Sequence, residues 1–146
     1  MRTRILIQAD TFNLNAEIAA LADGVAGAVA SFTGHVRHDD GLTSLTLEHY
    51  PGMTEAEIAC STAEAAARWP LTGITVIHRI GTLTPGDAIV LVAVAAAHRA
   101  EAFAACEFLV DYLKTQAPFW KEEARGGGRN WVEARSSDVA AADRWK

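Results

Sequence analysis

Cysteine and long apolar runs are scarce in this sequence, and each shortage excludes a class of protein. The two cysteines, Cys60 and Cys106, show no CxxC or other metal-ligand spacing, which argues against a zinc site or a disulfide framework. No apolar run approaches the roughly 18–20 residues that span a bilayer. The segment Ile5–Ile7 is also shorter than the roughly 7–15 apolar residues of a secretory signal. We therefore expect a cytoplasmic protein whose thiols are buried and inert.

Positive charge is also in short supply. The chain has 13 lysine and arginine residues against 18 aspartate and glutamate residues, for a formal net charge of −5. A surplus of negative charge disfavours binding to nucleic acid or to a membrane surface. The 146 residues suffice for one domain, residues 1–146, that buries roughly 68–70% of its unfolded surface. Such a core needs neither a metal nor a disulfide to fold.

The common cofactor and catalytic motifs are missing as well. The sequence has no GxGxxG after a predicted strand, no GxxxxGK(S/T) phosphate loop, no GxSxG elbow and no HExxH zinc motif. His35 and His38 form only a weak metal-binding pair on a segment that leaves a strand. We expect no metal and no cofactor.

Apolar periodicity and turn residues predict alternating groups of strands and helices. Strands are expected at 3–9, 27–36, 42–50, 73–80 and 88–96, with helices at 16–21, 54–69, 98–114 and 136–146. The strands at 73–80 and 88–96 are joined by a Pro-Gly turn, which makes them antiparallel. Strand 88–96 is nearly all apolar and is expected at the centre of a sheet. Without a steady βαβ alternation, this order indicates an α+β fold.

Several local features accompany this framework. Thr54 and Glu57 have capping-box spacing at a helix start, and Gly34 suggests a bulge or a close backbone approach within its strand. The strand at 42–50 is expected to return after the strand at 27–36, with Leu45 and Leu47 on one face. The segments 38–41 and 126–128 are expected to be mobile loops, and 131–134 a last short strand.

One helix gathers the positive charge that the rest of the chain lacks. The spacing predicts an amphipathic helix that starts at His98 and Arg99, ends near Lys114 and cannot pass Pro118. The expected buried face consists of Ala102, Phe103, Cys106, Leu109, Val110 and Leu113.

The candidate residues for an anionic ligand are the cations Arg37, His98, Arg99, Lys114 and Lys121. Arginine forms forked hydrogen bonds to phosphate or carboxylate, and a helix N-terminus favours anions. A lysine with a lowered pKa serves as a nucleophile or an acid–base group. Taken singly, each cation is more often a solvated or helix-capping residue. Phe119 and Trp120 are more often core plugs than walls of a pocket for a flat heterocycle. Spacing alone thus supports an anion-binding domain and nothing more specific.

Several longer phrases resemble the large subunit of molybdopterin synthase, the MoaE family of bacteria. They are FTGHVR (32–37), TLEHYPGMTE (46–55), RWPLTGITVIHRIGTLTPGD (68–87), AAHRAEAF (96–103), DYLKTQAPFWKEE (111–123) and WVEARSSD (131–138). The phrases occur in the family's order, from about Phe32 to the C-terminus.

The resemblance implies a fold, a reaction and partners. The family has an α+β fold of the α/β-hammerhead type, with antiparallel strands and packed helices. It converts cyclic pyranopterin monophosphate into molybdopterin by building a dithiolene. The sulfur arrives on the C-terminal thiocarboxylate of a small ubiquitin-like subunit of the MoaD type. Two large subunits form a homodimer within a heterotetramer.

The resemblance also assigns residues. Lys114 in DYLK and Lys121 in APFWK match the family's catalytic lysines. Positions that bind the pterin and its phosphate match Arg37, His98 and Arg99, with Phe32 and Arg135 lining the same region. Because the family's pockets form near the dimer interface, His98 and Arg99 are candidates to serve the partner subunit's site.

This chain departs from the family at Gln116 and Glu122, positions that are often basic there. The departure bears on partner docking and substrate affinity, whereas Lys114 and Lys121 are retained. Two other interpretations remain: a non-enzymatic scaffold for a ubiquitin-like partner or pterin phosphate, and a small phosphate-binding regulatory domain. Retention of both lysines favours the enzyme.

Overall fold

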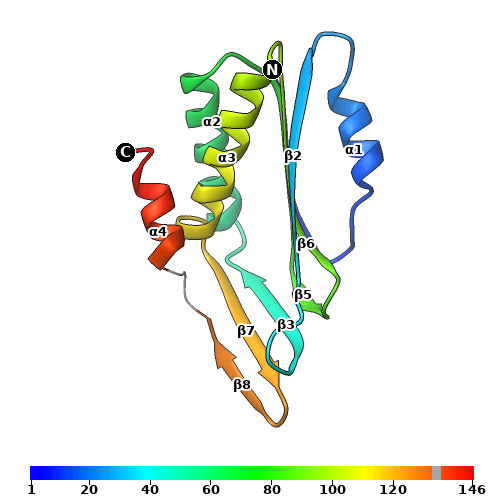
Figure 1. Cartoon of the computed structure of the whole chain (residues 1–146), viewed down its shortest axis with the longest axis vertical. Helices are drawn as coiled ribbons and strands as arrows, with labels where there is room; N and C mark the ends of the chain where they lie inside the picture. Colours follow the sequence, from blue (N-terminus) through cyan, green and yellow to red (C-terminus); the bar gives the residue numbers. More distant parts are fainter. Residues whose placement is uncertain (133–135) are drawn as a thin grey trace.

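The computed structural model describes residues 1–132 and 136–146, which form helices and two four-stranded sheets (Figure 1). This arrangement confirms the α+β class. The elements are β1 (Arg2–Gln8), α1 (Leu14–Leu21), β2 (Ala28–His35), β3 (Leu42–His49), α2 (Met53–Arg68), β4 (Leu71–Arg79), β5 (Gly81–Leu83), β6 (Ala88–Ala96), α3 (Arg99–Thr115), β7 (Phe119–Arg125), β8 (Gly128–Trp131) and α4 (Ser136–Asp143).

The first sheet has the order β1-β4-β6-β2, and its core lies on both faces of β6. Residues Leu91–Ala96 of β6 are 0% exposed, as expected for a continuous apolar strand at the centre of a sheet. Val92 and Val94 pack toward α3, while Leu91 and Ala93 pack toward α1. Helix α1 thus covers one face, and α2 and α3 cover the other (Figure 1). Strands β4 and β6 are antiparallel as predicted, whereas β1 pairs with β4 in parallel.

The second sheet has the order β5-β3-β7-β8 and extends beyond the end of α3 (Figure 1). Leu45 and Leu47 of β3 are buried as predicted. Contrary to the prediction from the sequence, the strand at 42–50 does not return alongside the strand at 27–36. Instead, β3 pairs with β5 and β7. Alternation shows which face of a strand is buried but does not name its neighbour.

The chain after α3 differs most from the sequence-based expectation. Pro118 follows the end of α3, as predicted, but residues Phe119–Arg125 then form β7. Glycines 126–128, expected as a mobile loop, lie at the turn and at the start of β8 in a β7–β8 hairpin. Of the expected strand at 131–134, Trp131 ends β8, and residues 133 and 134 lie outside the described residues.

The start of α2 is held by a different contact from the predicted capping box. The backbone N–H of Gly52 donates to Glu55 Oε2 at 2.9 Å, so the acidic partner is Glu55 and not Glu57. Thr54 is 0% exposed. Its hydroxyl accepts from the Tyr50 N–H at 3.0 Å and donates to the Pro118 carbonyl at 2.9 Å. Thr54 therefore ties α2 to the residue that precedes β7.

We predict that Thr54→Val lowers the free energy of unfolding by about 1–3 kcal/mol, because it removes two part-buried hydrogen bonds, each worth about 0.5–1.5 kcal/mol. Urea unfolding followed by circular dichroism measures the change. Thr54→Ser is the matched control, since it keeps the hydroxyl and removes only a methyl group, worth about 0.8 kcal/mol. Equal losses in both variants would contradict a role for the hydroxyl.

Candidate active site

The two lysines of the candidate site come from adjoining elements. Lys114 lies in the last turn of α3 and is exposed. Lys121 lies in β7, half-buried, with Leu47 of β3 directly opposite. Residues opposite each other in an antiparallel pair share a face, so Lys121 lies on the inner face of the second sheet with the buried Leu47. Phe119, two residues earlier, lies on that face as well.

His78 is a residue that the sequence analysis missed. It continues the row Ile74–Val76 on the face of β4 that packs toward α3, and only 6% of it is exposed. Its ring stacks on Phe119 with centroids 3.8 Å apart and planes 18° apart. Its Nδ1 lies 2.8 Å from the Arg79 carbonyl. A carbonyl only accepts, so Nδ1 carries the proton and Nε2 carries the lone pair. The sequence did contain a signal for this residue, because a histidine within an otherwise apolar, buried strand is a candidate for a functional role.

The charged and titratable groups that act on His78 of β4 come from three other elements, α3, β3 and β7. Burial lowers its pKa to about 4, opposed by the Arg79 carbonyl and assisted by the charges of Lys121, Lys114 and His49. Both lysines therefore lie within electrostatic range of one neutral imidazole. His49, at the end of β3, also lies 3.6 Å from Glu55 Oε1 through its Nε2. The fold thus gathers positive charge where α3, β3, β4 and β7 meet.

We predict that His78 destabilises the protein as the pH falls below neutrality. Its pKa is 6.5 ordinarily and about 4 when folded, so the unfolded chain binds a proton that the folded chain refuses. The free energy of unfolding then drops as pH falls from about 6.5 to 4, by about 3 kcal/mol in total, and the contribution is absent above pH 7. Urea unfolding at several pH values measures it. His78→Asn cannot titrate and is expected to flatten this part of the profile; an unchanged profile would contradict the prediction.

His98 and Arg99 lie at the opposite end of α3 from Lys114. His98 occupies the N-cap position and makes no side-chain capping hydrogen bond, and both residues are exposed. The 17 residues of α3 place the two ends about 25 Å apart. In Figure 1, β7 starts just beyond the C-terminal end of α3, the end whose last turn carries Lys114. A single chain therefore does not bring His98 and Arg99 to the lysines.

The remaining predicted residues lie around the sheets. Phe32 is partly buried in β2, opposite Val92, and packs against the core beneath α3. Arg37 is exposed, next to the buried Val36. The backbone of Val36 bonds to Asp87 and Gly86 of the turn between β5 and β6. Arg135 lies outside the described residues.

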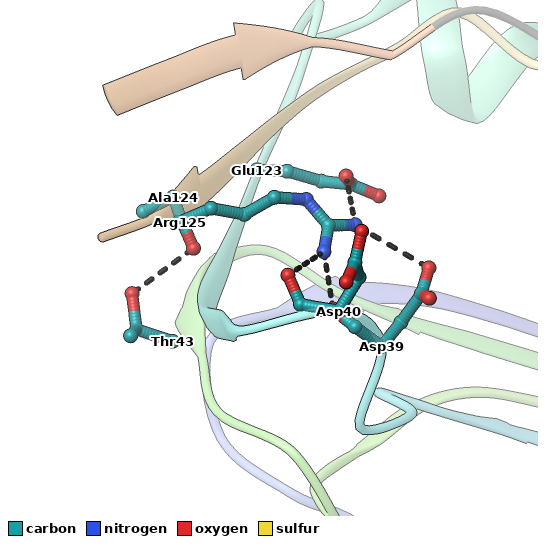
Figure 2. A network of polar contacts seen from close by, with 6 residues as sticks. All are labelled: Asp39, Asp40, Thr43, Glu123, Ala124 and Arg125. Carbon is teal, nitrogen blue, oxygen red and sulfur yellow. Dashed lines mark hydrogen bonds and ion pairs between the residues drawn. The ribbon is translucent and has the colours of Figure 1, made fainter. Parts of the chain in front are cut away.

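Arg125 contacts the loop that follows Arg37, the segment 38–41 that the sequence predicts to be mobile (Figure 2). The Arg125 guanidinium donates to the carbonyls of Asp39 and Asp40, the latter at 2.9 Å, and to Asp39 Oδ2 at 3.3 Å. It also pairs with Glu123 at 2.8 Å. The carboxylates of Glu123 and then Asp39 raise the pKa of Arg125. The end of β7 therefore anchors the loop that carries Arg37.

The two thiols lie in different environments. Cys106 is buried, and burial raises the pKa of its thiol to about 11. Cys60 is exposed, so the expectation that it is buried is wrong; its position in α2 faces outward. The His35 ring bonds to the Thr33 hydroxyl at 3.1 Å. Residues 1–132 and 136–146 contain no cluster of three or more side chains suited to hold a metal.

Two aromatic predictions also need correction. Phe103, placed on the buried face of α3, is 65% exposed, and the buried positions nearby are Ala102, Ala105 and Cys106. By helical spacing, Phe103 lies at the edge of the apolar stripe of α3. A small rotation of the helix about its axis is enough to turn a side chain at that edge toward solvent. Trp120 is 46% exposed, so it is not a core plug.

Of the two departures from the family pattern, Gln116 is exposed and Glu122 is partly buried. Glu122 forms a salt bridge with Arg129 at 3.0 Å. Gln116 is the exposed C-cap of α3.

No helix within the described part of the chain is long and apolar enough to cross a membrane. The fold and the site together define an α+β protein with a cationic site suited to an anionic ligand. Known proteins narrow this class: the family model described as MoaE protein matches residues 7–116. The chain therefore belongs to the MoaE family.

Individual relatives support this assignment over nearly the whole chain. A molybdopterin synthase catalytic subunit from Cereibacter sphaeroides is 54% identical, covering 97% of this chain and 99% of the relative. The structure of molybdopterin cofactor biosynthesis protein E from Burkholderia multivorans matches with a TM-score of 0.86 and 51% identity, covering 99% and 97% of the two chains. A complex of subunits 1 and 2 of molybdopterin-converting factor from Helicobacter pylori shares the fold, with a TM-score of 0.76 and 21% identity over 92% of each chain.

Proposed function

We propose that this chain, as one domain over residues 1–146, is the catalytic subunit of a molybdopterin synthase and acts in the cytoplasm. It takes sulfur from the C-terminal thiocarboxylate of a small ubiquitin-like subunit and builds the dithiolene on cyclic pyranopterin monophosphate. The observation that carries the proposal is that Lys114, in the last turn of α3, and Lys121, near the start of β7, both lie within electrostatic range of the buried His78. The names of the close relatives and the family model support the same reaction.

The cations suit each stage of this chemistry. The incoming tail is a thiocarboxylate anion and the acceptor carries a cyclic phosphate, so both are attracted to fixed positive charge. The thiocarboxylate sulfur attacks a carbon of the acceptor, and a carbon–sulfur bond forms as a carbon–oxygen bond of the acceptor breaks. The departing oxygen takes the electron pair and develops negative charge that a lysine can stabilise or protonate. The sulfur then joins the acyl group of the small subunit to the acceptor. Water then cleaves the acyl–sulfur bond, which leaves sulfur on the pterin and a carboxylate on the small subunit. Lys114 is the proposed acid–base or nucleophilic group, and Lys121 is the second cation.

A homodimer explains the position of His98 and Arg99. Since about 25 Å of helix separates them from Lys114 in one chain, we propose that they bind the pterin phosphate in the site of a second copy. Arg37 is the proposed contribution of the same chain, and its loop is held by Arg125 (Figure 2). Phe32 and Arg135 are proposed to line the pocket.

Reconstitution tests the proposal directly. The purified chain is mixed with thiocarboxylated small subunit and cyclic pyranopterin monophosphate, and the product is detected as an oxidised dithiolene derivative. Product formation with stoichiometric conversion of thiocarboxylate to carboxylate is the expected result. Binding of both partners without product would instead assign the chain to the scaffold class.

A further inference from the structure

His78 lies at the centre of the site without a role in the proposed sulfur transfer. Its flanking neighbours in the sheet are apolar, Ile7 on β1 and Val90 on β6. Burying an imidazole between such neighbours costs free energy unless its polar atoms are satisfied. The Nδ1–H satisfies one of them by donating to the Arg79 carbonyl at 2.8 Å. The other nitrogen, Nε2, carries a lone pair that suits a hydrogen-bond donor.

The packing of Phe119 connects this imidazole to Lys121. Phe119 is the first residue of β7, and its ring lies almost parallel to that of His78, with centroids 3.8 Å apart. Lys121 follows on the same face of the strand, about 7 Å further along. Movement of the His78 ring would therefore move the start of the strand that carries Lys121.

We propose that His78 is a positioning residue for Lys121: its stacked ring fixes the start of β7, and its Nε2 accepts a hydrogen bond from the Lys121 ammonium. Around the ring, the titratable groups of the packed elements are Lys121 of β7, Lys114 of α3 and His49 of β3, and Lys121 exerts the strongest effect of these charges. The low pKa of His78 keeps the ring neutral, so it can accept from an ammonium instead of repelling it. A bond to the charged form of a lysine raises its pKa and keeps it cationic.

Three substitutions separate the parts of this role. His78→Gln places an amide oxygen near the position of Nε2 and retains an acceptor there. His78→Asn keeps a donor near the position of Nδ1, and so the bond to Arg79, but does not reach Lys121. His78→Phe keeps a ring to stack on Phe119 and loses both nitrogens. Circular dichroism and urea unfolding establish that each variant is folded.

The experiment measures the apparent pKa of Lys121 by competitive labelling with acetic anhydride across pH, with each lysine quantified by mass spectrometry. Loss of a hydrogen bond to a charged group corresponds to a shift of about one to two pKa units. We expect that downward shift at Lys121 in His78→Phe and His78→Asn, with His78→Gln close to the native value. Lys146, which is exposed and paired with Asp143, is the internal control.

Two results would overturn the proposal. One is an unchanged pKa of Lys121 in all three variants, and the other is an equal shift in all three, which would indicate only altered packing. Only the link to turnover rests on the proposed function: there, His78→Phe and His78→Asn are expected to lose about tenfold or more in kcat, with smaller changes for His78→Gln. The labelling experiment needs no turnover. The pKa of Lys121 can therefore be measured, and the role of His78 tested, even if the chain proves not to transfer sulfur.

Discussion

Replacing Lys114 by alanine is expected to abolish dithiolene formation while leaving the fold and the binding of the small subunit intact. Loss of a positioned acid–base group costs about 10²–10⁴-fold in rate. Lys114 is exposed at the end of α3, where a lysine stabilises the helix by only about 0.3–1 kcal/mol. The effect on rate should therefore far exceed the effect on stability. Single-turnover formation of product in the reconstituted system measures it.

Two further variants sharpen the assignment of Lys114. Lys146→Ala removes a lysine that is 71% exposed at its side chain and lies outside the site, so its activity should match that of the native chain. Lys114→Arg keeps the positive charge but removes a group able to exchange a proton near neutral pH. Strong activity of Lys114→Arg would indicate an electrostatic role, and native turnover by Lys114→Ala would remove Lys114 from the mechanism.

Mixing two inactive variants is expected to restore activity if each site is shared between subunits. A chain with His98→Ala and Arg99→Ala would lack the phosphate-binding pair, and a Lys114→Ala chain would lack the lysine. In a heterodimer of the two, one site carries both lesions and the other carries none. Random exchange of subunits then restores about one quarter of the native sites. Refolding the two variants together and assaying product formation measures the recovery.

The chain offers a matched control for this mixing experiment. Lys114 and Lys121 lie near the same His78 in one chain, so a mixture of Lys114→Ala and Lys121→Ala chains should leave every site with a lesion. That mixture should stay inactive. If the His98/Arg99 mixture also stays inactive, the pair belongs to its own chain's site or has no role, and the shared-site proposal fails.

Local sequence patterns predicted the local structure well. The continuous apolar run from Ala88 to Ala96 required a central strand, and β6 is that strand. Asn13 caps α1 by accepting a hydrogen bond from the Ala16 N–H at 3.1 Å, a role that asparagine often plays at a helix start. The irregularity expected at Gly34 lies between Gly34 and His35 of β2. These features depend on residues close together in the chain, so their patterns are visible in it.

The errors share a different physical origin. Glu57 has capping-box spacing, yet its carboxylate accepts from Tyr112 of α3 at 3.1 Å, because tertiary packing determined the helix start. The strand β7 shows no alternation in FWKEEAR, because the charged Lys121 and Glu123 lie on its inner face, opposite the buried Leu47 and Leu45 of β3. Arg125 holds a loop more than 80 residues earlier in the chain, which no local pattern predicts (Figure 2).

The sequence by itself determined the order of elements, the buried faces of most of them and, through its family phrases, the two lysines and the chemistry to expect. Only the tertiary structure decided that β3 pairs with β7, that His98 and Arg99 are separated from Lys114 by the length of α3, and that both lysines lie within electrostatic range of His78. Periodicity records how each residue partitions between water and core. Periodicity carries no information about which distant element packs against that residue. The site is formed by contacts between elements that are far apart in the sequence, so only the tertiary structure shows it.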